Sequence, residues 1–115
     1  MRITLFGIPN CDSCKKARRW LESNDVEYEF HDVRVDGLTQ KDIQRWLKSV
    51  EWEKILNTRS TTWRNIPEAE RAIVDKKNVV QLLVKHPTLL KRPVMENGDR
   101  VTVGFSADQY SDLIE

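Results

Sequence analysis

The sequence predicts an α/β protein whose four-stranded mixed sheet is built from two separate parts of the chain. A strand–helix–strand pattern occupies residues 2–33, and an Asn97-Gly98 turn joins two strand-like runs near the other end. A strand–helix–strand unit of this length implies a parallel strand pair with a right-handed crossover. Asn-Gly between two such runs is the strongest short signal for a hairpin. The expected order is therefore β-α-β, then helices, then β-β-α.

The first strand and helix are predicted from two different periodicities. Residues 2–7 combine apolar and β-branched side chains, which suit a strand, and residues rich in glycine and proline then interrupt it. A helix is expected from about Asp12 to Asn24. Its apolar positions follow the i, i+3, i+4 spacing of a buried helical face: Ala17, Trp20 and Leu21.

Residues 26–33 alternate between apolar and polar side chains, which predicts the second strand. Val26, Tyr28 and Phe30 should then share one face of the sheet. After a turn at Asp36-Gly37, residues 39–92 are interpreted as a mostly helical insertion within one domain that spans residues 1–115. No flexible linker flanks this segment.

The insertion is expected to contain short helices and one polar loop. Thr39 is a plausible N-cap, Pro67 fits the first turn of a helix that reaches about Lys76, and residues 79–85 form a further helix. Residues 57–64 are rich in hydroxyl groups and read as a loop that could offer donors to an anion. In the Pro67 helix, the side chains expected to face inward are Ala69, Ala72 and Ile73.

The end of the chain completes the predicted sheet. Residues 94–96 and 99–103 flank the Asn-Gly turn as two strands, and Ser106 with Gln109 forms a capping box that begins a final helix. This order of elements is that of the thioredoxin-like fold carrying a helical insertion.

The two cysteines, Cys11 and Cys14, lie where the first helix is expected to begin. Unpaired N–H groups and the positive end of the helix dipole favour a thiolate there. Lys15 and Arg18 follow Cys11 on roughly the same helical face, and we expect them to lower its pKa further. Cys11 is therefore the predicted nucleophile.

Other readings of the cysteine pair are weaker. A zinc site would need further ligands, and neither His31 nor His86 stands in a metal-ligand spacing. Two inert structural cysteines remain an alternative. A redox pair is favoured because the motif follows a strand and opens a helix.

The composition indicates which binding partners and which cellular compartment to expect. A net charge of +1 gives no strong field to attract nucleic acid or a membrane surface. We expect neither a membrane span nor a signal peptide, because no apolar run has the required length or flanks. Two cysteines do not make a secreted disulfide scaffold, so a reducing cytoplasm is the expected location.

The chain resembles the bacterial family that contains glutaredoxin-coupled arsenate reductases, Spx regulators and YffB-like reductases, with the YffB-like branch nearest. The resemblance extends nearly from end to end. Its landmarks are Gly7-Ile8-Pro9-Asn10-Cys11, Lys15-Lys16-Ala17-Arg18, Phe30-His31-Asp32, Asp36-Gly37, Leu56-Asn57-Thr58-Arg59, Thr61-Thr62-Trp63-Arg64, His86-Pro87, Lys91-Arg92-Pro93 and Gly104-Phe105-Ser106.

The resemblance implies roles for individual residues. Cys11 matches the family's nucleophile, Arg92 and Arg59 match arginines that contact the oxyanion in the arsenate reductases, and Pro93 matches a proline that is cis in this fold. A further arginine of those enzymes is missing at residues 103–106. Cys14 is not a cysteine in them, although Spx regulators carry a second cysteine there.

The expected function is that of a glutathione-dependent thiol-disulfide oxidoreductase with no bound cofactor or metal. Arginines suit the two carboxylates of glutathione as well as they suit an oxyanion. Cys14 or a second glutathione would resolve the mixed disulfide on Cys11. The alternatives are an Spx-like redox sensor that binds the α-subunit of RNA polymerase, and an arsenate reductase with glutaredoxin as its partner.

Overall fold

The computed structural model describes residues 2–114, which divide into two compact units. The first contains the chain up to Asp36 and again from Arg92 on, and the second spans Gly37–Lys91. The second unit thus begins two residues before the insertion predicted at 39–92 and ends one residue before it. Arg92 belongs to the unit that carries both cysteines. That the chain forms one domain stays a prediction.

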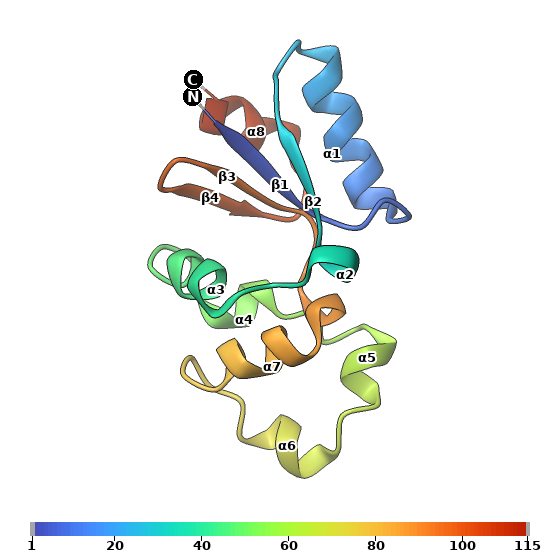
Figure 1. Cartoon of the computed structure of the whole chain (residues 1–115), viewed down its shortest axis with the longest axis vertical. Coiled ribbons are helices and arrows are strands. Elements are labelled where there is room, and N and C mark those ends of the chain that lie inside the picture. Colours follow the sequence, from blue (N-terminus) through green and yellow to red (C-terminus); the bar gives the residue numbers. More distant parts are fainter. Residues whose placement is uncertain (1, 115) are drawn as a thin grey trace. The chain divides into compact units, whose positions relative to one another are not determined.

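The first unit is organised around one four-stranded sheet with the order β2-β1-β3-β4. Strand β1 (Ile3–Gly7) pairs in parallel with β2 (Glu29–Asp32) and antiparallel with β3 (Val94–Asn97), which pairs antiparallel with β4 (Arg100–Val103) (Figure 1). This confirms the predicted mixed sheet and its thioredoxin-like topology.

Strand β2 is shorter than predicted at both ends, because it begins at Glu29 instead of Val26 and ends at Asp32. Val33 already begins a short helix, α2 (Val33–Asp36), which is not extended strand. The Asp32 carboxylate accepts the backbone N–H groups of Arg34 at 2.9 Å and Val35 at 3.4 Å. An aspartate that bonds the backbone two and three residues ahead favours a turn over a continuing ladder, which explains the difference.

Helices α1 (Asp12–Ser23) and α8 (Ala107–Ile114) bury their apolar sides against one face of this sheet. Val26, Tyr28 and Phe30 pack on the same core, as their alternation predicted. Ser106 accepts the Gln109 N–H at the start of α8, at 3.4 Å. The buried core cluster consists of Ile3, Leu5, Ala17, Leu21, Met95, Tyr110 and Leu113.

The second unit consists of short helices. The predicted Thr39 N-cap is confirmed, because Thr39 and Asp42 form a reciprocal capping box. Leu56, in the middle of the unit, forms an antiparallel bridge with Leu90 near its end. The helices are α3 (Gln40–Trp46), α4 (Trp52–Ile55), α5 (Thr61–Arg64), α6 (Glu68–Ala72), α7 (Val79–Lys85) and the 3-10 helix η1 (Pro87–Leu89).

Two predictions about this unit were wrong. The expected loop at 57–64 contains α5, because the Ser60 hydroxyl accepts the Trp63 N–H and caps a helical turn. The helix after Pro67 ends at Ala72, where the Asn78 side chain donates to the Ile73 carbonyl at 2.7 Å. Such side-chain bonds to the backbone compete with helix continuation. The residues expected to face inward, Ala69, Ala72 and Ile73, are exposed.

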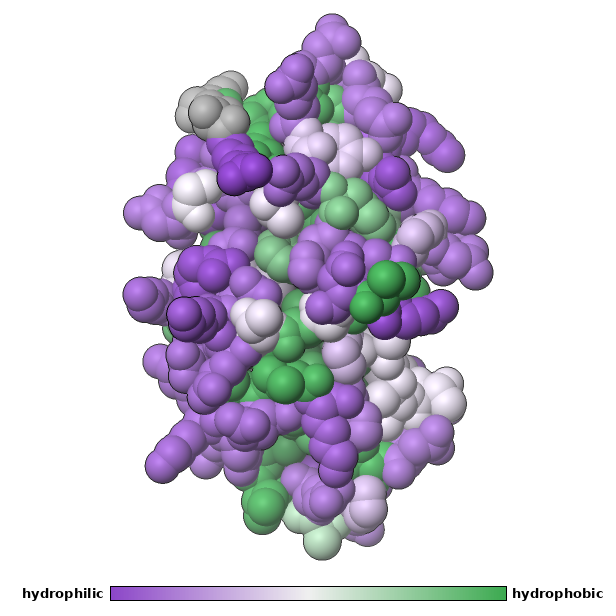
Figure 2. All heavy atoms as spheres, in the orientation of Figure 1, coloured by the Kyte–Doolittle hydropathy of each residue, from purple (hydrophilic) through white to green (hydrophobic). Residues whose placement is uncertain are grey.

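Most of the surface visible in Figure 2 is hydrophilic, with hydrophobic residues in small patches between polar ones. Among the residues that the structure describes, no helix has the length and apolar character needed to cross a membrane.

Gly7, the last residue of β1, lies directly against the Cys14 sulfur. A Cβ atom at Gly7 would stand 2.5 Å from Cys14 Sγ, well inside van der Waals contact. Glycine at this strand end therefore gives the buried sulfur the space that it occupies.

Replacing Gly7 with alanine should destabilise the fold by about 1–3 kcal/mol, because the new methyl group overpacks a site with no room for it. Urea unfolding of Gly7→Ala measures this loss. Cys14→Ala removes the clashing sulfur, and the next nearest atom, Cys14 Cβ, would be at 3.5 Å. The double variant should therefore recover most of the loss, and strictly additive effects of the two substitutions would contradict this packing.

Candidate active site

Cys11 occupies the N-cap position of α1 and is only partly exposed. Its carbonyl accepts the first helical hydrogen bond, from the Lys15 N–H at 2.9 Å, and its extended backbone (φ −134°) fits an N-cap. The sulfur therefore lies at the end of the helix where unpaired N–H groups and the helix dipole favour a negative charge.

Cys14 lies one helical turn further on and is completely buried. Both cysteines are free thiols. Burial raises the pKa of the Cys14 thiol to about 12, and its hydrogen bond to Cys11 and the negative charge of Cys11 add to this effect. A backbone hydrogen bond from Ile8 and the charge of Arg92 offset only part of it. Cys14 therefore keeps its proton when Cys11 is a thiolate.

The pKa of Cys11 is lowered below its ordinary value. Burial raises it, but hydrogen bonds from the backbone and thiol of Cys14, together with a hydrogen bond and the positive charge of Arg92, outweigh that effect. The sulfur does not form a full N-cap hydrogen bond, so the Cys14 N–H contributes at longer range. Cys11 is thus the thiolate and Cys14 is its hydrogen-bond donor.

Arg92 reaches Cys11 from the segment that leads into β3. The Arg92–Pro93 peptide bond is cis, as the resemblance implied. The Pro93 carbonyl accepts the Gly104 N–H at 2.8 Å, which fastens this segment to the end of β4. Sheet pairing therefore holds the segment from which the Arg92 guanidinium reaches the sulfur, and the structure brings together Cys11, Cys14 and Arg92. Pro93 follows Arg92 in the chain, and its place beside Cys11 stays a prediction.

Comparison with known proteins identifies the family of the chain. Residues 6–113 match the model of the ArsC family, which is nearly the whole chain. The chain belongs to the ArsC family. Within residues 2–114, no group of three or more His, Cys, Asp and Glu side chains is placed to hold a metal ion.

The chain is similar to three differently described relatives. The structure of a YffB protein superposes with a TM-score of 0.93 and 38% identity, over 98% of this chain and 99% of that one. A protein from Brucella melitensis described as arsenate reductase (ArsC) related gives 42% identity and a TM-score of 0.74, over 100% of this chain and 96% of that one. The global transcriptional regulator Spx of Streptococcus pneumoniae strain R6 is 32% identical over 109 residues, which cover 93% of this chain and 81% of Spx.

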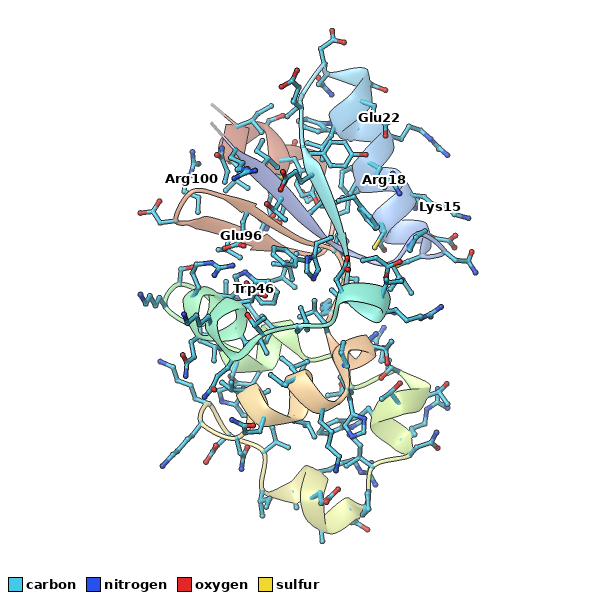
Figure 3. All side chains as sticks on the ribbon, in the orientation of Figure 1. Lys15, Arg18, Glu22, Trp46, Glu96 and Arg100 are labelled. Carbon is cyan, nitrogen blue, oxygen red and sulfur yellow. The ribbon has the colours of Figure 1, made fainter. Side chains whose placement is uncertain are left out.

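Lys15 and Arg18 do not have the effect on Cys11 that the sequence predicted. The interactions that lower the Cys11 pKa come from Cys14 and Arg92. The Arg18 Nε donates to the Tyr28 hydroxyl at 3.0 Å, and its guanidinium lies 4.3 Å from the centre of the Phe30 ring. These contacts hold Arg18 against β2, and Tyr28 in turn donates to Glu22. Figure 3 shows Lys15, Arg18 and Glu22 spaced along α1. That Lys15 and Arg18 bind an anion stays a prediction.

Arg59 belongs to the second unit. Its backbone N–H donates to the Asn57 side chain at 3.1 Å, and its carbonyl accepts from Arg64 at 3.2 Å. These bonds fix the turn before α5 and leave the Arg59 side chain exposed. Its predicted part in binding an anion at Cys11 stays a prediction.

Two features of the site were not predicted from the sequence. The hydrogen-bond donor to Cys11 is the Cys14 thiol, and the CxxC spacing within one helical turn is the signal that could have revealed it. Tyr110 lies in the final helix, where the sequence pattern gives it no part in the site, yet it interacts electrostatically with Cys14. Nothing in the local pattern around Tyr110 distinguishes it from an ordinary core residue.

Replacing Arg92 with glutamine should raise the Cys11 pKa, because the thiolate loses a hydrogen bond and a nearby positive charge. Since the thiolate is the reactive form, alkylation of Cys11 by iodoacetamide near neutral pH should slow several-fold in Arg92→Gln. The matched variant Lys15→Gln should leave the pH dependence of alkylation unchanged. A shift in Lys15→Gln, with none in Arg92→Gln, would show that the helix lysine controls the thiol instead.

Proposed function

We propose that this ArsC-family protein is a glutathione-dependent thiol-disulfide oxidoreductase in which Cys11 is the nucleophile. The proposal is carried by the difference in exposure and in pKa between the two cysteine sulfurs. Cys11 is partly exposed and has a lowered pKa, whereas Cys14 is buried and has a pKa raised to about 12. A nucleophilic thiolate beside a second thiol that stays protonated is what a disulfide-exchange site needs.

In the proposed reaction, the Cys11 thiolate attacks one sulfur of a disulfide. The S–S bond of the substrate breaks, one thiolate leaves with the electron pair, and Cys11 becomes part of a mixed disulfide. A glutathione thiolate then attacks that disulfide and restores Cys11. Alternatively Cys14 attacks Cys11, and two glutathione molecules reduce the resulting internal disulfide.

Charge at the site supports glutathione as the thiol. Arg92 lies beside Cys11, and a carboxylate of glutathione could pair with its guanidinium after the sulfur has reacted. Pro93 has no backbone N–H, and we propose that the extended backbone next to it lies along the bound peptide. Lys15, Arg18 and Arg59 are proposed as further contacts for glutathione or an oxyanion. Glutaredoxin is the alternative reductant.

A second candidate function is that of a redox-sensing regulator. It is favoured by the 32% identity to Spx, which is a transcriptional regulator, and by the presence of two cysteines rather than one. Retention of this protein on the isolated C-terminal domain of the RNA polymerase α-subunit, only in one redox state, would support this candidate.

Reduction of arsenate is a third candidate, suggested by the similarity to the Brucella melitensis protein. It predicts arsenate turnover with glutaredoxin that is lost in Arg92→Ala. The absence of arginine from residues 103–106 argues against arsenate as the main substrate, since one expected oxyanion ligand is missing.

The proposal is tested with Cys11→Ser and Cys14→Ser in an assay that follows reduction of a small glutathione mixed disulfide. Cys11→Ser should lose activity by at least about a hundredfold, because a serine hydroxyl is not ionised at neutral pH. Cys14→Ser should retain activity if a second glutathione resolves the intermediate, and should lose it if Cys14 does. Wild-type activity in Cys11→Ser would refute the proposal.

A further inference from the structure

The hydroxyl of Tyr110 is a buried polar group for which packing gives no explanation. Tyr110 is 0% exposed, and its oxygen finds no hydrogen-bond partner within residues 2–114. The Tyr110 ring makes edge-to-face contacts with the rings of Trp20 and Phe105, at centroid distances of 5.7 Å and 5.0 Å. An unsatisfied buried hydroxyl reduces stability, so a phenylalanine would serve these contacts at least as well.

The place of Tyr110 in the core puts it next to the buried half of the cysteine pair. Tyr110 belongs to the core cluster together with Ala17 and Leu21 of α1. Cys14 precedes Ala17 by one helical turn and is buried on the same side of that helix. Burial raises the pKa of the Tyr110 phenol, and the charge of Cys14 raises it further, so the two groups are close enough to interact.

The Cys14 thiol loses its charged acceptor during the proposed reaction and keeps the backbone hydrogen bond from Ile8. In the resting site, the Cys14 thiol donates a hydrogen bond to the Cys11 thiolate. Once Cys11 is joined to glutathione, its sulfur carries no negative charge, and this bond loses its charged acceptor. For Cys14 to attack, it must ionise in a buried position, where a thiolate is disfavoured unless a donor faces it.

We propose that Tyr110 is a positioning residue for Cys14, whose hydroxyl donates a hydrogen bond to the Cys14 sulfur as that sulfur ionises and resolves the mixed disulfide. This inference rests on the proposed function. It makes the protein a dithiol enzyme, because a hydroxyl kept for Cys14 has no use when a second glutathione resolves the intermediate.

The step balances without a further reactant. Cys14 loses its proton, which the departing glutathione thiolate takes up, and its sulfur attacks the Cys11 sulfur. The bond between Cys11 and glutathione breaks, and glutathione leaves with the electron pair as a thiolate. The two protein sulfurs become a disulfide, so Cys14 is oxidised and the glutathione sulfur is reduced. Tyr110 keeps its proton throughout and contributes only the hydrogen bond.

The full chain can be tested with an aromatic disulfide reagent, dithiobis(nitrobenzoate), whose released thiolate absorbs visible light. The first equivalent reports attack by Cys11, and the second reports attack by Cys14 on the mixed disulfide. In Tyr110→Phe, the second phase should slow by about threefold to tenfold, because the Cys14 thiolate loses a hydrogen bond. Its pH profile should move to higher pH, and the first phase should not change.

Thr102→Val is the matched control. The Thr102 hydroxyl of β4 is also buried without a partner in the described part of the chain, but Thr102 is not among the groups that shift the pKa of Cys14. Thr102→Val should leave both phases unchanged. Thermal unfolding should show Tyr110→Phe to be at least as stable as the wild type, which excludes a folding defect as the cause of a slower second phase.

A second variant tests the inference in the opposite direction. Tyr110 replaced by 3-fluorotyrosine keeps its packing but becomes a stronger donor, so the second phase should accelerate. An unchanged second phase in Tyr110→Phe, or equal slowing of both phases, would overturn the inference. The first phase tests the proposed function separately, because it reports only the attack of Cys11 on the reagent. The absence of a first phase would show that Cys11 is unreactive and would refute the proposed function.

Discussion

The hydrogen bond between the two cysteine sulfurs is the interaction on which the site depends. Two thiols within one helical turn compete for ionisation, and their surroundings decide which one loses its proton. Cys11, at the partly exposed helix start, receives donors from Cys14 and Arg92, so its pKa is lowered. Cys14 is buried beside the negative charge that it stabilises, so its pKa is raised. One arrangement therefore produces both a nucleophilic thiolate, Cys11, and a second thiol that stays protonated, Cys14.

The sheet and helix α8 support this arrangement at three points. Gly7 at the end of β1 leaves space for the Cys14 sulfur, since any side chain there would overlap it. The bond from Gly104 to the Pro93 carbonyl holds the start of β3, and with it the Arg92 side chain that contacts Cys11. Tyr110 closes the core on the side of α8. Residues far apart in the sequence thus act on one pair of sulfurs.

The sequence predicted much of this because its strongest signals are local. The mixed sheet, the first helix with Cys11 at its start, and the Asn97-Gly98 hairpin all follow from short-range periodicity and turn chemistry. The effect assigned to Arg18 was wrong because helical spacing cannot show that its guanidinium packs on Phe30 instead. The environment of Tyr110 was not predicted, because an orphaned hydroxyl is a property of tertiary packing. The early end of β2 and the helix at Thr61–Arg64 depend on single side-chain bonds to the backbone, which composition does not reveal.

The most direct test of the account is an NMR titration of the reduced protein with cysteine labelled at ¹³Cβ. The resonance of each cysteine reports its own ionisation, with Cys14→Ala and Cys11→Ser providing the assignments. We expect two widely separated transitions, with the pKa of Cys11 below the ordinary value of a cysteine and the pKa of Cys14 above it. Two transitions close to the ordinary value, or the lower one at Cys14, would contradict it.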